Sequence, residues 1–336
     1  MKKVFCFGEI LLRMSPALHG EWIKNASMPV HIGGAELNVA NALAKWNVSV
    51  QYCSAAPDNY LAREIIAHLQ QKNIDTTPFI FSGNRIGIYM LPQGTDLKNA
   101  GVIYDRAHSS FSELKPGTID WDSQLKNTEW FHFSAISPAL NKDAALVCKE
   151  ALIAASEKKI TISVDLNYRS KLWQYGTAPV EVMPELVQYC DVVMGNIWSA
   201  NSLLGIPPDA TIHDKKSKEA YLDHANVTSG AIMLQFPKCK TVANTFRFDA
   251  DSGIQYYATL NEDLQQYVSK EYIMNNITDK VGSGDCFMAG LIFGKRNHYA
   301  PQQTINFAAA AATGKMLETG DATQQTIEDI LKRLSE

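Results

Sequence analysis

The chain has 336 residues, of which 46% are hydrophobic and 20% are charged. The 31 lysine and arginine residues against 35 acidic residues give a net charge of −4, which excludes a strongly basic nucleic-acid-binding surface and an intrinsically disordered chain. No run of about 18 apolar residues occurs, so a membrane-spanning helix is not predicted.

The N-terminal elements predict a strand, a glycine turn and a helix. A short apolar run at Val4–Gly8 is typical of a buried strand, and Gly33-Gly34 opens a helix over Ala35–Lys45. Two stretches, 13–33 and 79–108, hold glycines and prolines among β-forming residues and lack a helical period. We predict that they form β-rich excursions from the main domain.

From residue 130 onward, apolar strand-like runs alternate with helical patterns. The strand-like runs lie at 130–134, 160–167, 191–196 and 231–236. The helical patterns lie at 143–158, 179–189, 199–204, 285–297, 302–317 and 324–334. This alternation indicates βαβ units and a parallel sheet that is covered on both faces. We predict one α/β domain over residues 1–336.

The six cysteines are scattered without a C-x-x-C pair, which disfavours a zinc site and a disulfide framework. Glu9 and Arg13 interrupt the N-terminal apolar run before it reaches the length of a signal peptide. We therefore expect a cytoplasmic protein with reduced thiols and with neither a nucleic-acid nor a membrane partner.

A small-residue turn carries the clearest chemistry. Gly282, Ser283 and Gly284 lead into an apolar helix that begins at Asp285. Small residues let the backbone approach a ligand, and the N–H groups of a first helical turn favour an anion. A carboxylate beside an anion site opposes binding unless it acts on the ligand, as a general base does. The alternative is that Asp285 only caps the helix.

Two separated segments, 33–42 and 279–290, resemble the signatures of the ribokinase or pfkB family of carbohydrate kinases. The resemblance runs through nearly all of the chain. It implies a ribokinase-like fold with a mainly parallel central sheet, helices on both faces and a small β lid formed by 13–33 and 79–108. Gly314-Lys315 is followed by Met316, so a P-loop does not compete with this reading.

The resemblance also implies the reaction, with ATP as phosphoryl donor, magnesium as cofactor and a sugar hydroxyl as acceptor. Asp285 is then the catalytic base, and Gly282, Ser283 and Gly284 form the anion hole for the transferring phosphoryl group. Charge in the loose transition state sits on the phosphoryl oxygens, and the base takes a proton late. Asp285 can therefore stay ionised and still serve as the base.

Three further segments, at 87–90, 104–106 and 165–173, are similar to those with which the 2-keto-3-deoxygluconate kinases of this family hold their substrate. The residues that would line the sugar site are Gly34, Asn38, Tyr89, Tyr104, Arg106 and Arg169. An arginine offers a planar pair of donors that matches a carboxylate, so two arginines favour an acidic sugar. Alternatively, Arg106 lies exposed on a turn, Arg169 pairs with Asp165 or a surface acid, and both tyrosines merely pack a sheet face.

The nucleotide side departs from the family pattern. Asn196 begins the family's Asn-x-x-Glu element, but Ser199 stands in place of the glutamate. No direct metal ligand is predicted, and Asn196 would act on magnesium through water. Asn306 resembles the residue near the adenine, with a plain helix-surface amide as the alternative. Met233–Pro237 replaces the usual strand ending.

The leading hypothesis is an ATP-dependent kinase that phosphorylates the terminal hydroxyl of 2-keto-3-deoxygluconate. One alternative is a kinase for a neutral ketohexose such as fructose or for another deoxy sugar acid. A second alternative is a non-catalytic sugar-binding sensor on the same scaffold. A dinucleotide-dependent oxidoreductase is disfavoured because Gly33-Gly34 lacks the G-x-G-x-x-G spacing. The edges of the lid strands predict a homo-oligomer that associates through the lid.

Overall fold

The computed structural model describes residues 2–92, 101–215, 217–250 and 253–335. Within them, ten strands form one central sheet: β1 (Lys3–Phe7), β4 (Val50–Cys53), β6 (Ile74–Asp75), β10 (Thr128–Ser134), β11 (Thr161–Asp165), β12 (Val192–Gly195), β13 (Thr241–Ala250), β14 (Gly253–Glu262), β15 (Gln265–Val268) and β16 (Tyr272–Met274). Their order is β15-β14-β13-β12-β11-β10-β1-β4-β6, with β16 paired to β14. The strands from β6 to β13 are parallel, and β14 pairs with its neighbours antiparallel.

Alternate residues of the sheet belong to two different cores. On β1, Val4 and Cys6 pack into one hydrophobic cluster, whereas Phe5 and Phe7 pack into the other. Successive side chains of a strand point to opposite faces, so a strand that is apolar throughout must be covered on both sides. The predicted mainly parallel sheet between two helical layers is confirmed.

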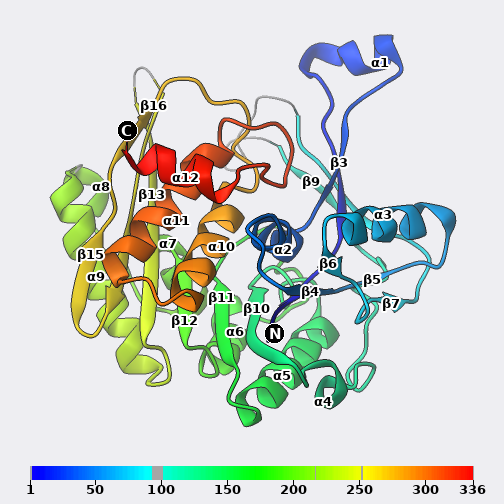
Figure 1. Ribbon diagram of the computed structural model, residues 1–336, viewed down its shortest axis with the longest axis horizontal. Coiled ribbons are helices and arrows are strands. Elements are labelled where there is room, and N and C mark those ends of the chain that lie inside the picture. The colour runs from blue at the N-terminus through cyan, green and yellow to red at the C-terminus, as the bar shows by residue number, and fades with distance from the viewer. Residues whose placement is uncertain (1, 93–100, 216, 251–252, 336) are drawn as a thin grey trace.

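The helices divide between these two faces. Figure 1 shows α10, α11 and α12, in orange and red, together on one face. The first cluster is covered by α2 (Ala35–Lys45), α3 (Tyr60–Gln71), α10 (Ser283–Arg296), α11 (Pro301–Lys315) and α12 (Ile327–Ser335). The second cluster is covered by α4 (Trp121–Gln124), α5 (Lys142–Glu157), α6 (Pro179–Val187), α7 (Ile197–Leu204) and α9 (Lys218–Gln235).

A second sheet of four strands stands beside the first. Its order is β3 (Val30–Gly33), β2 (Leu11–Met14), β8 (Gly87–Met90) and β9 (Ile103–Asp105). Its strands come from the two stretches that were predicted to form the lid, although β2 begins two residues earlier. The part of the second stretch at 93–100 lies outside the described residues. The role of this sheet as a lid stays a prediction.

Short elements complete the fold. The 3-10 turn η1 (Leu18–Gly20) and helix α1 (Glu21–Asn25) lie between β2 and β3, and Figure 1 shows α1 projecting away from the body of the molecule. Strands β5 (Ala55–Ala56) and β7 (Ile80–Phe81) form a separate pair, and α8 (Ile212–Lys215) precedes α9. None of the helices in the described ranges has the length and apolarity needed to cross a membrane.

One predicted strand is wrong. The apolar run at 231–236 is not a strand but the end of α9, an 18-residue helix that Ser217 caps by accepting a hydrogen bond from the Ala220 N–H. The helix ends at Gln235, two residues before Pro237, whose ring nitrogen has no N–H to donate. The strand of the sheet is β13 instead, which starts at Thr241.

Candidate active site

A cavity of about 550 Å³ opens where the carboxyl ends of the central strands meet the four-stranded sheet and the start of α10. Ligands of open α/β sheets bind at this edge. The cavity collects nearly the whole predicted site, although its members are spread from residue 34 to residue 285. The predicted residues that line it are Gly34, Asn38, Tyr89, Tyr104, Arg106, Arg169, Asn196, Gly282, Ser283, Gly284 and Asp285.

The turn before α10 is shaped for an anion. Gly282 has a φ of +79°, and a Cβ at this position would lie 2.1 Å from the carbonyl oxygen of Asp321, so a larger residue does not fit. Gly282 precedes the helix as its N-cap and no side chain caps this end, which leaves the first turn open to the cavity. The alternative that Asp285 serves as the helix cap is therefore wrong.

Asp285 is a buried carboxyl that faces this cavity. The side-chain amide of Asn38 donates a hydrogen bond of 2.7 Å to its Oδ2. Burial is the main cause that raises the pKa of Asp285 to about 8, and the charges of Asp165 and Glu36 add to it, against the hydrogen bond from Asn38. Burial therefore favours the protonated form of Asp285 near neutral pH, whereas a role as a base requires the ionised form.

Asp165 is a second carboxyl that lines the cavity. From the sequence it was considered only as an ion-pair partner of Arg169, not as a site residue. It ends β11, its Oδ1 accepts a hydrogen bond of 3.1 Å from the Asn167 N–H, and burial raises its pKa to about 6. Among the ion pairs of the described residues, none joins Arg169 to Asp165. The position of Asp165 at the carboxyl end of a parallel strand was the signal that would have placed it in the site.

The donor set of the cavity suits magnesium. No group of three or more histidine, cysteine or acidic side chains suited to a metal occurs among the described residues. Magnesium does not need one, because it keeps several waters and binds substrate phosphates together with one or two protein oxygens. Asp165 and Asn196 supply such oxygens, and a divalent cation would relieve the repulsion between Asp165 and Asp285.

Ser199 has a structural reason to replace the family's glutamate. Asn196 caps α7, since its Oδ1 accepts hydrogen bonds from the N–H groups of Trp198 at 3.1 Å and Ser199 at 2.8 Å. In return, the Ser199 Oγ accepts a hydrogen bond of 2.9 Å from the Asn196 N–H. This reciprocal pair is a capping box. Glutamate is common at the third helical residue of such a box, which is the position of Ser199. The exchange therefore preserves the helix start while removing one carboxylate from the cavity.

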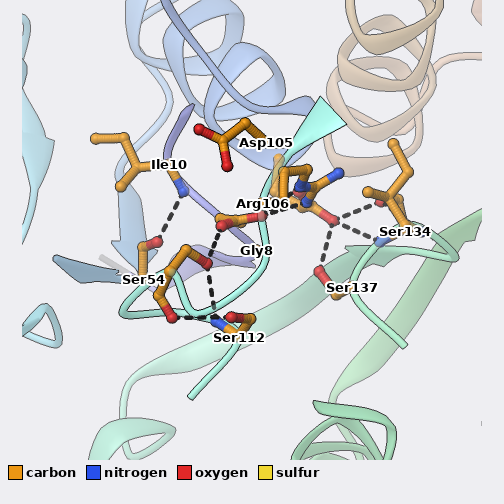
Figure 2. Close-up of polar contacts among 12 residues, drawn as sticks. Gly8, Ile10, Ser54, Asp105, Arg106, Ser112, Ser134 and Ser137 are labelled. Atoms are coloured by element: carbon orange, nitrogen blue, oxygen red, sulfur yellow. Dashed lines mark hydrogen bonds and ion pairs between the residues drawn. The ribbon is translucent and has the colours of Figure 1, made fainter. Parts of the chain in front are cut away.

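Arg106 lies in the cavity wall but already has an acidic partner. It is only 5% exposed, and its Nε and Nη2 lie 2.6 Å and 2.5 Å from Oε2 of Glu9. The Ser109 hydroxyl donates to the other oxygen of Glu9. The alternative that Arg106 is exposed on a turn is wrong, and Glu9 faces this arginine rather than solvent. Figure 2 shows Arg106 within the network of polar contacts around Gly8.

Glu36 is another buried carboxylate close to this site. The N–H and hydroxyl groups of Ser134 donate to Oε1 of Glu36 at 2.8 Å and 2.6 Å, and the Ser137 hydroxyl lies 3.5 Å from the same oxygen. Figure 2 shows both serines beside this contact. Burial raises the pKa of Glu36 to about 7, with Ser134 opposing the shift. Glu36 acts on the site through its charge on Asp285.

The two predicted tyrosines, Tyr89 and Tyr104, line the cavity and also pack against neighbouring side chains. The rings of Tyr89 and Tyr104 lie 6.4 Å apart, and the Tyr89 hydroxyl donates a hydrogen bond of 2.9 Å to Asp321. Each tyrosine thus combines the predicted cavity position with the sheet packing given as the alternative. Arg169 is half-buried and donates a hydrogen bond of 3.0 Å to the Tyr168 carbonyl.

Three further cations line the cavity and were missed from the sequence: Lys171, Arg247 and Lys280. Lys171 donates a hydrogen bond of 2.9 Å to the carbonyl of Val102. Arg247 lies on β13, and it was missed because that strand was assigned to residues 231–236. Alternation along the correct strand brings Thr245 and Arg247 to the same cavity.

Asn306 does not line the cavity. Its side-chain carbonyl accepts hydrogen bonds from the Lys270 N–H at 3.1 Å and from the Gln302 amide at 3.2 Å. These contacts join α11 to the segment after β15, and the predicted contact with adenine stays a prediction.

Comparison with known proteins gives concordant matches. The model of the pfkB family carbohydrate kinases matches residues 1–232. The crystal structure of a 2-dehydro-3-deoxygluconokinase from Thermotoga maritima superposes with a TM-score of 0.89 at 36% identity, covering 100% of both chains.

Two further matches extend the comparison. A 2-dehydro-3-deoxygalactonokinase from Haloferax volcanii is 26% identical over 326 residues, covering 96% of this chain and 94% of that one. A protein described as a ribokinase II from E. coli, crystallised with ATP and Mg²⁺, shares the fold at 16% identity with a TM-score of 0.77, covering 100% of this chain and 99% of that one.

Proposed function

The chain belongs to the pfkB family of carbohydrate kinases, and we propose that it transfers the γ-phosphoryl group of ATP to the terminal hydroxyl of 2-keto-3-deoxygluconate. One observation carries the proposal. Asp285 stands at the open N-terminus of α10, inside a cavity that also holds several cationic side chains. A sugar and ATP bound together in this cavity would therefore contact the base, the N–H groups at the start of α10 and the cationic side chains.

The chemistry follows from these positions. The acceptor hydroxyl lies against Asp285, whose ionised carboxylate takes the hydroxyl proton as the bond to phosphorus forms. Backbone N–H groups at Gly282–Gly284 donate to the oxygens of the transferring group, where charge gathers in the transition state. Magnesium bound with ATP would neutralise phosphate charge, held by Asp165 and Asn196 directly or through water. The four-stranded sheet acts as the lid that excludes water.

The cations support an acidic sugar. Arg169 and Lys171 reach the cavity from the loop after β11, and Arg106 reaches it from the end of β9. The names of the Thermotoga and Haloferax relatives point to 2-keto-3-deoxy sugar acids. A second candidate is a neutral ketohexose, which is favoured by the pairing of Arg106 with Glu9, since a neutralised arginine has less charge to offer a carboxylate.

A substrate panel tests the proposal. We expect ADP release from MgATP with 2-keto-3-deoxygluconate or its galactonate epimer to exceed that with fructose, ribose or gluconate by about 10²-fold or more in kcat/KM, because unpaired buried donors reject the wrong ligand. Preference for fructose would select the neutral-sugar candidate. Sugar binding without ADP release from any member of the panel would favour the non-catalytic sensor.

We also propose that the protein self-associates through the lid, in a cytoplasmic setting that keeps its six buried, free cysteines reduced. The lid region exposes Trp22, Ile23, Val30 and Ile103. Exposed large apolar side chains that gather in one region are typical of an interface. Sedimentation at micromolar concentration should show a dimer or larger species. Ile23→Asp should dissociate it, whereas Leu234→Asp, at an exposed site on α9, should not. A monomeric wild-type profile would contradict this prediction.

A further inference from the structure

A lysine without a role in the reaction described so far is buried behind the anion cradle. Lys315 ends α11 and has no solvent exposure. Its ammonium donates a long hydrogen bond of 3.4 Å to the carbonyl of Glu318. Burying an ammonium costs free energy unless opposite charges compensate it. Burial lowers the pKa of Lys315, and Asp279 leads the carboxylates that act in the opposite direction.

The position of Lys315 connects it to the cradle. Its Cε lies 3.4 Å from the point where a Cβ on Gly282 would stand. The carbonyl of the next residue, Met316, accepts hydrogen bonds from the N–H groups of Thr278 at 2.9 Å and Asp279 at 3.3 Å. The end of α11 therefore supports the loop that enters the anion cradle.

Lys315 adds a positive charge to a group of buried charged side chains beside this loop. Arg13 binds two carboxylates, with Nη2 lying 2.7 Å from Asp279 and Nε lying 2.7 Å from Asp321. Asp279 also accepts a hydrogen bond of 3.0 Å from the Val281 N–H, within the loop itself. One guanidinium against two carboxylates leaves a negative charge beside a site for phosphate. The ammonium of Lys315 adds a positive charge that Asp279 and Asp321 attract.

A further acid near Lys315 is directed elsewhere. The carboxylate of Glu318 accepts hydrogen bonds from the Thr323 hydroxyl at 2.7 Å and the Gln324 N–H at 2.9 Å, and its side chain is partly exposed, so water screens its charge. Lys315 thus belongs with Asp279, Asp321 and Arg13 as a charge cluster behind the cradle.

We propose that Lys315 is a positioning residue for phosphoryl transfer, whose buried ammonium offsets the Asp279 and Asp321 carboxylates and so keeps the loop at 279–284 receptive to the transferring phosphoryl group. This inference rests on the proposed kinase function. It assigns to Lys315 an electrostatic effect on the anion, transmitted through the loop, and not a contact with the sugar.

The test replaces Lys315 with a neutral side chain of similar length. Lys315→Met should lower kcat by about 10- to 100-fold, less than the loss of a direct oxyanion donor, and leave the KM for the sugar close to the wild-type value. The thermal midpoint should stay the same or rise, because replacing a buried charge by an apolar group is often neutral or stabilising. The control is Lys295→Met on α10, which removes a partly exposed ion pair with Glu262 of β14.

A compensating change separates charge balance from packing. Asp321→Asn in the Lys315→Met background removes one carboxylate while keeping an acceptor for the Tyr89 hydroxyl, so it should recover most of the lost kcat. A double variant no better than Lys315→Met, or a Lys315→Met variant with wild-type kcat, would overturn the inference. If Lys315→Met does not fold, Lys315→Gln takes its place with the same expected outcomes.

A binding measurement distinguishes failure of this inference from failure of the proposed function. The ADP–aluminium fluoride complex mimics the transferring phosphoryl group and needs no turnover. Lys315→Met should weaken its binding by about 10-fold or more relative to wild type, while the affinity for ADP alone changes little. Equal weakening of both ligands, or of neither, would overturn the inference even if the wild-type protein phosphorylates no sugar of the panel.

Discussion

Asp285→Asn should reduce kcat by about 10²- to 10⁴-fold, the range expected for loss of a positioned general base. The amide has nearly the shape of the carboxylate, but it cannot accept the proton of the attacking hydroxyl. Its oxygen can still accept the hydrogen bond from Asn38 that Asp285 accepts at 2.7 Å. Steady-state kinetics with the preferred sugar acid measures the effect, and near-normal turnover would end the assignment of Asp285 as the base.

Stability provides the control for this variant. Because the folded-state pKa of Asp285 is raised to about 8, the folded protein holds a proton that the unfolded chain has released. This carboxyl therefore makes stability fall as the pH rises from about 4 toward 8. Asp285→Asn removes that loss, so its thermal midpoint at pH 8 should equal or exceed the wild-type value. A lower midpoint would mean that the kinetic loss reflects misfolding.

The same carboxyl governs the pH dependence of the wild-type protein. Only the deprotonated form accepts a proton, so kcat/KM should rise with pH and level off above about 8. Asp165→Asn removes a neighbouring negative charge that contributes to the raised pKa of Asp285, and the apparent pKa of the profile should then fall. A flat profile between about pH 6 and 9 would contradict this part of the prediction.

The second large effect is expected at the Arg106–Glu9 pair. Arg106→Met leaves the carboxylate of Glu9 buried without its cation, and removing one partner of such a pair costs about 3–5 kcal/mol of unfolding free energy. Glu9→Gln added to Arg106→Met should restore most of this stability. Urea unfolding measures both variants. Arg85→Met, which breaks a more exposed pair with Asp105, is the matched control and should cost about 1 kcal/mol or less.

Kinetics of the stable double variant then separates the two candidate substrates. If Arg106 also binds the sugar carboxylate, Glu9→Gln/Arg106→Met should lower kcat/KM for 2-keto-3-deoxygluconate by about 10²-fold, the effect of losing a charge-assisted hydrogen-bonded pair. Turnover of fructose should change little. An unchanged preference for the acid would mean that Arg169 and Lys171, which line the same cavity, bind the sugar carboxylate instead of Arg106.

Local patterns were sufficient for β1, for β10 to β12 with the helices between them, and for the C-terminal helices, but not for β4, β6 or the antiparallel strands β13 to β16. Apolar strands and helical periods along the chain predict the parallel sheet, because each pattern depends on a few consecutive residues. The run at 231–236 shows the limit of this reasoning, since a short apolar run suits a buried strand and a buried helix end equally well. That error concealed Arg247, whose strand begins ten residues later, at Thr241.

The sequence by itself determined the candidate anion cradle and carboxylate at Gly282–Asp285, because a small-residue turn, a helix start and a carboxylate are adjacent along the chain. The tertiary structure decided which charges act there. Glu9 pairs with Arg106 across 97 residues, Asn38 reaches Asp285 across 247, and Arg13 reaches Asp321 across 308. Such pairings depend on how strands and loops meet in space, and so does the burial that sets the pKa of each carboxyl. Neither property can be deduced from local sequence patterns.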